Sequence, residues 1–415
     1  MNRRTMLLSG AAMISGCVVV PSPTPSLQRG LWRDDDGAFA IGRFSEYGDS
    51  DFGFDYAALR VGALVDRAEG SARLSSALNG AGPAIATLTA EGASLRMESR
   101  RLQPVTIDRG AFEARSPDAT LSAELATPTG SKPRGTMLMI YGSGPAPKEA
   151  FDPWAFWFLS QGFAVLAYDK RGSGRSTGDW RVSGLEALAE DAKATLLAAK
   201  AIGLSGPVFG WGASQAGWVL PQLGAAGALD GFIMHAGSAM RPGDQILAQV
   251  EAELRAYGFP KEEIDRSRAY YTLDTDVSRG VRPWDEVKAA YDAASASGAE
   301  WLLAPPAAPD APERTMVRLM ADFDPEPYWR ANRAPVLALF GAKDWIVPAD
   351  ENLAALKGMT AQGADVATRI MPGANHLMFE SDTGLRDEYP TRSRIVPQYF
   401  AEIERWLSAR AAPRS

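Results

Sequence analysis

The sequence predicts an α/β protein with a doubly wound, mostly parallel β-sheet, and three features of its pattern lead to this fold class. Short apolar runs recur from residue 105 onward, and several are continuous, as in parallel strands that are covered on both faces. Helical segments alternate with these runs, which is the order of a doubly wound sheet. One long helical stretch, residues 240–332, interrupts the alternation. The candidate strands are residues 105–114, 120–127, 136–141, 163–168, 207–211, 231–235, 335–340 and 367–371.

Two of the helices between and after these strands have clear local signals. Ser183-Gly184-Leu185-Glu186 is a capping box, and apolar residues continue from it at helical spacing. Pro397 stands at a helix start near the C-terminus, and an apolar stripe follows it. Both segments are therefore expected to pack one face against the sheet.

The composition excludes several classes of function. The 415 residues are 46% apolar and 22% charged, as in an ordinary globular protein, and their formal net charge is −7. A negative chain gives no reason to expect nucleic acid as a partner. Cys17 is the only cysteine, so a disulfide or a thiolate metal site within the chain is excluded, and no metal or cofactor is expected. Any histidine-dependent mechanism must use His235 or His376, the only two histidines.

The first residues are typical of a targeting segment. Arg3 and Arg4 precede an apolar run, residues 6–16, that is too short to span a bilayer but suits a signal peptide. The run ends in Ile14-Ser15-Gly16-Cys17, which resembles a bacterial lipobox, in which the cysteine is lipidated and becomes the first mature residue. We therefore expect an exported protein, lipid-anchored through Cys17 to the bacterial cell envelope and facing the periplasm at the outer membrane. A plain signal peptide is the alternative, and the paired arginines leave both the general and the twin-arginine export routes open.

The predicted domain organisation follows from shifts in composition. Residues 1–16 are the signal peptide, and residues 17–26 form a Pro/Ser-rich lipidated tether. Residues 27–103 show short alternating runs broken by glycines, which predict a small β-rich module. Residues 104–415 form the α/β domain, in which residues 240–332 are a helical insertion that caps the edge of the sheet.

The insertion is rich in aromatic residues, among them Trp284 and Tyr271. One interpretation is that they line a pocket for the acyl or leaving group of a substrate. The other is that they form the insertion's own core, the commoner role of aromatic residues at helical spacing.

The segment Gly212-Ala213-Ser214-Gln215-Ala216 joins an apolar run directly to a helical pattern, with a serine at the turn. This is the form of a nucleophile elbow, a sharp strand-to-helix turn that presents a serine hydroxyl above the sheet. The turn strains the backbone, and large side chains two positions from the serine would collide with the strand and the helix. Ser214 is therefore the predicted nucleophile, and an ordinary Gly/Ser turn is the alternative.

A serine nucleophile needs a base, and the base needs an orienting carboxylate. Asp344 follows the candidate strand 335–340, and His376 follows the candidate strand 367–371. In a doubly wound sheet both loops open on the same edge as the serine turn. The sequence thus predicts Ser214, His376 and Asp344 as a catalytic triad.

Alternatives remain for two of these roles. Asp350 or Asp244 replaces Asp344 as the acid if Asp344 only caps a turn. His235 also follows a strand and is the alternative base, although it precedes the acid loop in the sequence.

The negative oxygen of an acyl-transfer intermediate needs N–H donors that are already in place. The residue after the nucleophile, Gln215, is expected to give one backbone N–H. The glycine-rich turn Tyr141-Gly142-Ser143-Gly144-Pro145 is expected to give the other, from Ser143, with Gly142 or Gly144 as alternatives. A phosphate-binding loop is disfavoured because no Gly-Lys-Ser/Thr sequence follows.

Three segments together resemble the bacterial α/β-hydrolase family of serine esterases related to prolyl-oligopeptidase-type hydrolases. They are the turn at 141–145, the run Tyr-Asp-Lys-Arg-Gly-Ser-Gly-Arg-Ser-Thr-Gly-Asp-Trp at 168–180, and the elbow at 212–218. The resemblance covers residues 104–415, and the chain order of serine, acid and histidine agrees with that of the family. It implies the α/β-hydrolase fold and hydrolysis of carboxylic esters through an acyl-enzyme.

The sequence departs from the family pattern at two positions. Tyr141 stands where the family usually has histidine, which bears on the packing of the loop, and Ala216 replaces a usual glycine. Asp169 and Arg171, within the second segment, are expected to form a structural ion pair that braces the oxyanion loop.

The predicted function is that of a serine carboxylesterase that acts on a small-molecule ester. A peptidase or acyl-aminoacyl hydrolase with the same triad is the nearest alternative. It requires an arginine or paired acids to anchor a peptide terminus, and no compact cluster of that kind stands out in the sequence. A non-catalytic binding lipoprotein is the alternative from another class.

The lipobox predicts how Cys17→Ala changes the behaviour of the protein. The wild-type chain is expected to incorporate labelled fatty acid and to enter the detergent phase in a phase-separation assay. Cys17→Ala is expected to do neither, because the acyl chains added at this cysteine are what hold the protein at the membrane. Labelling and partitioning of Cys17→Ala at wild-type levels would contradict the lipobox.

Overall fold

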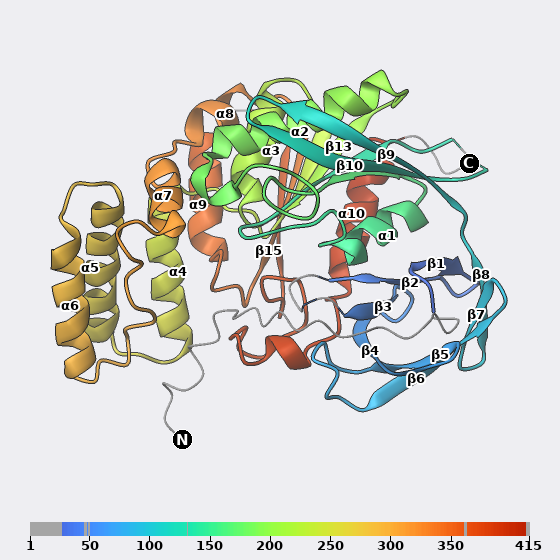
Figure 1. The fold of residues 1–415 in the computed structure, drawn as a ribbon, viewed down its shortest axis with the longest axis horizontal. Helices are drawn as coiled ribbons and strands as arrows, with labels where there is room; N and C mark the ends of the chain where they lie inside the picture. The colour runs from blue at the N-terminus through green and yellow to red at the C-terminus, as the bar shows by residue number, and fades with distance from the viewer. Residues whose placement is uncertain (1–26, 45–47, 49, 131, 361–362, 412–415) are drawn as a thin grey trace.

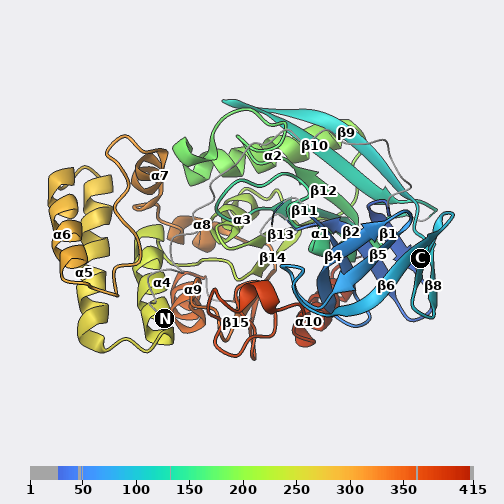
Figure 2. The ribbon, with the colours of Figure 1, turned by 60° about the horizontal axis from the view of Figure 1, so that its bottom comes forward.

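The computed structural model describes residues 27–44, 48, 50–130, 132–360 and 363–411 of the chain. The predicted signal peptide and tether, with Cys17, lie outside the described residues. The described chain consists of an N-terminal β-barrel and an α/β part with a helical insertion (Figure 1). The barrel and the outer helices of the insertion lie at opposite ends of the molecule (Figures 1 and 2).

The N-terminal β-rich module is present, and it is a closed antiparallel barrel of eight strands. Each strand pairs with the next, and β1 pairs back with β8, with Trp32 opposite Pro104. Alternate side chains fill the interior with an apolar core that includes Phe39, Leu88 and Leu102. The strands are β1 Gly30–Arg33, β2 Ala38–Arg43, β3 Asp51–Asp55, β4 Arg60–Ala68, β5 Ser71–Ser75, β6 Ala84–Glu91, β7 Ser94–Met97 and β8 Arg100–Pro104.

The α/β part contains an eight-stranded sheet in the order β16-β15-β14-β13-β11-β12-β10-β9. The pairs from β16 to β12 are parallel, whereas β10 is antiparallel to both β12 and β9. The strand ends differ by at most two residues from those expected. The strands are β9 Ile107–Ser116, β10 Ala119–Pro128, β11 Thr136–Ile140, β12 Ala164–Tyr168, β13 Val208–Ala213, β14 Gly231–His235, β15 Val336–Gly341 and β16 Val366–Met371.

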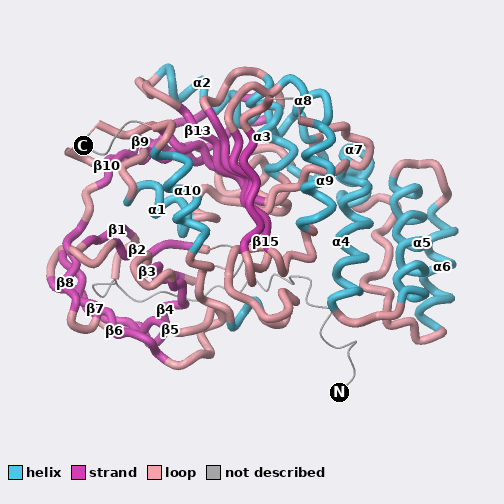
Figure 3. Tube along the Cα trace, turned by 180° about the vertical axis from the view of Figure 1, so that it is seen from behind, coloured by secondary structure: helices cyan, strands magenta, loops and turns pink. Residues whose placement is uncertain are grey.

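Helices cover both faces of this sheet (Figures 1 and 3). Helices α1 and α10 lie on the face toward the barrel, where the rings of Trp157 and Phe400 stack at 4.7 Å. Helices α2, α3, α8 and α9 lie on the other face and contact one another in that order. Their bounds are α1 Asp152–Ser160, α2 Leu185–Ala201, α3 Ala216–Ala225, α8 Glu326–Ala331, α9 Ala349–Met359 and α10 Gln398–Ser408.

The helical insertion lies between β14 and β15 and has a hydrophobic core of its own. Its helices are α4 Pro242–Ala256, α5 Lys261–Ser278, α6 Trp284–Ala296 and α7 Pro312–Met320, after which α8 returns to the sheet. A one-turn 3-10 helix, η3 Trp180–Val182, contacts α7, and a second, η4 Tyr389–Thr391, precedes α10. Across the described residues, we find no helix with the length and apolar character needed to cross a bilayer.

The barrel is joined to the α/β part by side chains and by main-chain pairing. Phe44, at the end of β2, is fully buried, and its ring lies 5.5 Å from Trp154 of α1 and 6.2 Å from Phe379. The Val61 N–H donates to the carbonyl of Ser393 at 2.7 Å, and the Ile395 N–H donates to the carbonyl of Leu59 at 2.9 Å. One outer face of the barrel therefore belongs to the main hydrophobic core of the protein.

The shared core predicts that Phe44→Ala destabilises the barrel and the α/β part together. Removing a buried phenylalanine ring costs about 3–5 kcal/mol of the free energy of unfolding, through lost burial and the cavity left behind. Urea unfolding followed by tryptophan fluorescence and by circular dichroism is expected to show one coincident transition, moved to lower urea. The control is Phe39→Ala in the barrel interior, which removes the same side chain without touching the junction. Separate transitions for the two parts in the wild type would contradict the prediction.

Candidate active site

Ser214 stands between β13 and α3 with a backbone φ of +53°. This left-handed conformation costs a non-glycine residue about 1–3 kcal/mol and persists only where the surroundings impose it. Here the Ser214 N–H donates to the carbonyl of His235 at 3.1 Å, and the Ser214 carbonyl accepts the N–H groups of Gly217 and Ser238. The turn is therefore fixed from both sides, with the serine side chain partly exposed above it.

Small residues around Ser214 have a direct steric reason. A Cβ atom at Gly212 would lie 2.5 Å from the Ala216 Cβ and 3.0 Å from the Ile140 Cβ. Ala216 is thus accommodated because residue 212 has no side chain. Gly217 is equally constrained, since a Cβ there would lie 2.3 Å from the Ser238 carbonyl oxygen. This constraint on Gly217 was not predicted, because its only signal in the sequence is that of one more glycine in the elbow segment.

Asp344 and His376 lie together at the carboxyl edge of the sheet, in the loops after β15 and β16. The His376 Nδ1 is 2.8 Å from the Asp344 Oδ2. The Asp344 Oδ1 accepts the N–H groups of Ile346 and Val347, both at 2.9 Å. The carboxylate is therefore fixed by its own turn, and its side chain is fully buried against the imidazole. An imidazole oriented in this way through Nδ1 exchanges protons at Nε2.

The alternative acids lie elsewhere. Asp350 is in the first turn of α9, and Asp244 is in the first turn of α4, where a carboxylate is favoured by the helix dipole. The carboxylate that bonds the His376 ring is that of Asp344.

His235, the alternative base, is buried below the site. Its Nδ1 is 2.7 Å from the hydroxyl of Tyr399, which also accepts a hydrogen bond from Trp211 Nε1 at 3.0 Å. Its ring packs against Trp154 and Trp211. Burial, together with the proximity of His376, lowers the pKa of His235 well below its ordinary value. His235 is therefore a neutral interior residue whose carbonyl supports the serine turn.

The glycine-rich loop after β11 lies beside Ser214. A Cβ at Gly142 would lie 3.4 Å from the Ser214 Cβ, so the loop main chain and the serine are neighbours. Ser143 is exposed at this place, and Gly144 has a φ of +100°, which favours glycine. Gln215 is buried at the start of α3. The structure thus brings both segments with predicted oxyanion donors to Ser214.

The expected ion pair between Asp169 and Arg171 is not formed. Arg171 makes a bidentate pair with Asp191 of α2, with N–O distances of 2.6 and 2.7 Å. Asp169 instead accepts the backbone N–H groups of Lys148 and Arg175, both at 2.8 Å. The two side chains therefore stabilise different neighbours. Asp169 binds the chain that follows the loop 141–145, and Arg171 connects its own turn to α2.

Most of the aromatic residues of the insertion form its own core, whereas Phe323, Tyr328 and Trp329 join the main core of the protein. Trp284 and Tyr271 pack against the cluster that includes Tyr270 and Trp301, and the Trp284 Nε1 donates to the carbonyl of Ala307 at 3.0 Å. Helices α5 and α6, which carry them, lie on the far side of α4 from the sheet (Figure 1). The interpretation in which they line a substrate pocket is therefore wrong, and the core interpretation holds.

In the part of the chain that the structure describes, no group of three or more histidine, cysteine, aspartate or glutamate side chains could hold a metal ion. The arrangement that is present is a serine on a strained turn, a histidine bonded to a buried carboxylate, and a glycine-rich loop beside the serine. This is the constellation of a hydrolase on an α/β sheet.

Residues 141–387 match the family model described as the alpha/beta hydrolase family. This is more than half of the chain, and the protein belongs to that family. No curated protein matches the sequence.

Several solved structures are similar to this chain at low sequence identity. Est1E from Butyrivibrio proteoclasticus, solved with ferulic acid, is 15% identical and has a TM-score of 0.48, over 72% of this chain and 99% of its own. Proline iminopeptidase from Mycobacterium smegmatis is 15% identical with a TM-score of 0.48, over 72% of this chain and 98% of its own. The Pyrococcus furiosus esterase Pf2001 is 14% identical with a TM-score of 0.46, over 73% and 91%. The family assignment rests on the sequence match alone.

The contact between residues 212 and 216 predicts a compensating pair of substitutions. Gly212→Ala is expected to lower the free energy of unfolding by about 1–3 kcal/mol, because the new methyl group meets Ala216 in a packed site. Adding Ala216→Gly removes the nearest clash and is expected to restore part of that loss. Chemical denaturation of the two single variants and the double variant gives the coupling free energy. Strictly additive effects would show that the elbow does not depend on this contact.

Proposed function

We propose that the protein is a serine hydrolase that cleaves carboxylic esters of small molecules through an acyl-enzyme. Ser214 is the nucleophile, His376 the general base and Asp344 its orienting acid. The backbone N–H groups of Ser143 and Gln215 bind the oxyanion. The observation that carries this proposal is the bond of His376 Nδ1 to the buried Asp344 carboxylate, at the sheet edge where Ser214 is held in a strained turn.

The proposed reaction has two half-reactions. The Ser214 Oγ attacks the ester carbonyl while its proton passes to His376 Nε2, and the tetrahedral oxyanion is bound by the two N–H groups. Collapse of this intermediate breaks the bond to the alcohol, which leaves with the proton from His376. Water then attacks the acyl-enzyme by the same path and releases the carboxylic acid.

Apolar side chains near Gln215 support an ester of modest polarity as the substrate. The Gln215 Nε2 lies 3.4 Å from the sulfur of Met320, the last residue of α7, and η3 with Trp180 contacts α7. The insertion thus contacts the residue after Ser214 through α7, and we propose that this helix, not α5 or α6, shapes the substrate pocket. Export and lipid anchoring through Cys17 remain part of the proposal, on the sequence pattern alone.

The proposed triad predicts the effect of two substitutions, alone and combined, on ester turnover. Ser214→Ala and His376→Ala are each expected to lower kcat by on the order of 10⁴–10⁶, and the double variant by hardly more, since the triad acts as a unit. The assay is hydrolysis of a p-nitrophenyl ester series, beside aminoacyl-nitroanilides and a fluorophosphonate probe that labels an active serine. Preferred cleavage of the anilides would replace the esterase by a peptidase.

The matched control is the other histidine. His235→Asn keeps an acceptor near the Tyr399 hydroxyl and is expected to hold kcat within about tenfold, a change of about 1.4 kcal/mol in the barrier. Circular dichroism must show that each variant is folded. An active His376→Ala beside an inactive, folded His235→Asn would overturn the assignment of the base, and no probe labelling at Ser214 would overturn the hydrolase itself.

A further inference from the structure

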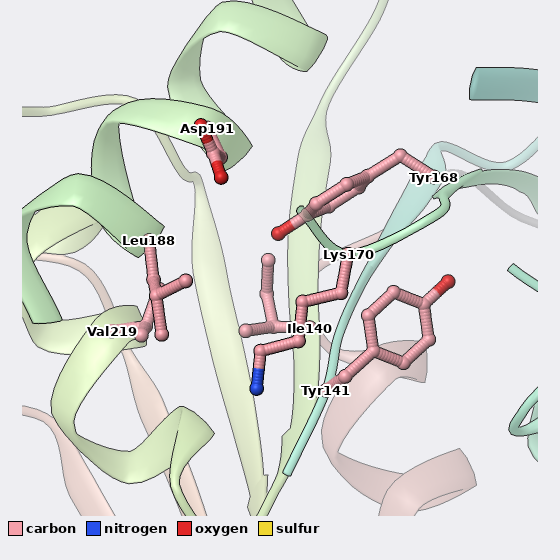
Figure 4. Close-up of a pocket in the computed structure, with 7 residues that line it drawn as sticks. All are labelled: Ile140, Tyr141, Tyr168, Lys170, Leu188, Asp191 and Val219. Atoms are coloured by element: carbon pink, nitrogen blue, oxygen red, sulfur yellow. The ribbon is translucent and has the colours of Figure 1, made fainter. Parts of the chain in front are cut away.

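Lys170 is a buried lysine beside the proposed oxyanion hole that the mechanism above does not use. It lies two residues after β12 and is 4% exposed. Its Nζ donates to the carbonyl oxygens of Gly142 and Gly144, at 2.8 and 3.2 Å, and to Gln215 Oε1 at 2.8 Å. The same nitrogen lies over the Trp180 ring, 5.0 Å from the ring centroid. Figure 4 shows the side chain extended beside Ile140, among the residues that line a small cavity.

The two carbonyl contacts fix the peptide that contains a predicted oxyanion donor. The Gly142 carbonyl and the Ser143 N–H belong to one planar trans peptide, in which they point in opposite directions. Holding that oxygen on Lys170 therefore turns the Ser143 N–H away from Lys170. The Gly144 contact fixes the chain on the other side of Ser143. The loop has two glycines of its own and needs such restraint, because glycine leaves the backbone free to rotate.

The third contact of Lys170 is with Gln215, the residue that is proposed to give the other N–H donor. Gln215 contributes its backbone N–H to the proposed hole, and its side-chain oxygen is held by the same nitrogen. One side chain thus ties together the two segments whose N–H groups are proposed to bind the oxyanion.

The set of acceptors requires the charged form of the lysine. An ammonium group has three N–H donors, and the three contacts are two carbonyl oxygens and one amide oxygen. A neutral amine has only two N–H donors, so one oxygen would face a lone pair. Among the described residues, no carboxylate pairs with this nitrogen, because the neighbouring Asp191 is held by Arg171.

We propose that Lys170 is the positioning residue of the oxyanion hole, and that its ammonium group sets the Ser143 and Gln215 N–H groups before the substrate arrives. This inference rests on the proposed function of Ser214. Donors that are already oriented stabilise the tetrahedral intermediate without a cost of reorganisation, and losing one such donor lowers kcat by on the order of 10²–10³-fold.

The proposal predicts that kcat falls as the pH rises through neutrality. Burial lowers the pKa of Lys170 to about 7, against the opposing effect of Asp191. The titratable groups around Lys170 are Asp191 of α2, which is paired with Arg171, and Tyr141 and Tyr168, whose pKa values are raised by burial so that both stay neutral. As the pH rises through the pKa of Lys170, one of the three contacts is lost, and kcat is expected to fall.

The test is Lys170→Met, measured on the full protein with a p-nitrophenyl ester. It is expected to lower kcat by on the order of 10²–10³-fold, as for the loss of one donor. KM is expected to stay near the wild-type value, because the oxyanion forms only in the reaction. A trifluoromethyl ketone, which forms a tetrahedral adduct, is expected to lose affinity in parallel with kcat/KM, whereas a non-reactive amide analogue of the ester keeps its affinity. The matched control is Lys193→Met on α2, which removes an exposed lysine paired only with Glu190.

A second variant tests the charge and does not depend on the folding of Lys170→Met. Gln215→Glu places a carboxylate on the ammonium group, which raises the pKa of a lysine by about 1–3 units and moves the alkaline loss of kcat to higher pH. Two results would overturn the inference. One is a fall of kcat with rising pH that occurs at the same pH in Gln215→Glu as in the wild type, and the other is a folded Lys170→Met with a kcat near that of the wild type. Both results leave Ser214 labelling intact, whereas the absence of labelling in the wild type would refute the proposed function first.

Discussion

The strained backbone of Ser214 is the constraint on which the rest of the site depends. Pairing of β13 with β14 places Ala213 opposite His235, so the His235 carbonyl is at the right level to accept the Ser214 N–H. The ring of the same histidine is held among Trp154, Trp211 and Tyr399, far from water. A strained turn is kept only where packed neighbours determine it. The aromatic core below the sheet edge is therefore what keeps the serine in an unfavourable conformation.

The acid and the histidine are held by short-range bonds within their own loops. Asp344 is capped by two N–H groups of its turn, and Asn375 Oδ1 accepts the N–H groups of Leu377 and Phe379 at 3.0 Å. The loop after His376 then packs on the barrel through Phe379 and Phe44. The barrel thus supports the histidine loop from outside, although no barrel residue belongs to the proposed triad.

Much of the α/β part was predictable because its signals are local. Continuous apolar runs identified the strands, and small residues around Ser214 identified the elbow. The order of the loops then indicated Asp344 and His376, which the structure places in contact. The partner of Arg171 was not predictable, because Asp169 is close in the sequence but the turn directs the two side chains to different neighbours.

Contacts between residues that are far apart in the chain could not be predicted, because no local sequence pattern indicates them. Closure of the barrel depends on β1 meeting β8, which the alternating runs alone do not specify. In the sequence, Lys170 is one charged residue within the segment 168–180. Its three hydrogen-bond acceptors could not be predicted, because they belong to two other segments of the chain. From the sequence, the aromatic residues of the insertion are equally compatible with a pocket lining and with a hydrophobic core. Their packing against α4 and α5 in the structure decides in favour of the core.

The main-chain pairing of residues 59–61 with residues 393–395 has a consequence for the synthesis of the protein. Ribosomes make the barrel first, and neighbouring strands of a meander pair early because their contacts are close in sequence. The segment that covers the barrel and holds the histidine loop follows the last strand of the sheet and is therefore translated much later than the barrel. A nascent chain therefore carries barrel strands with an uncovered apolar side until residues 393–395 have emerged, and this is the interval in which a chaperone has a surface to bind.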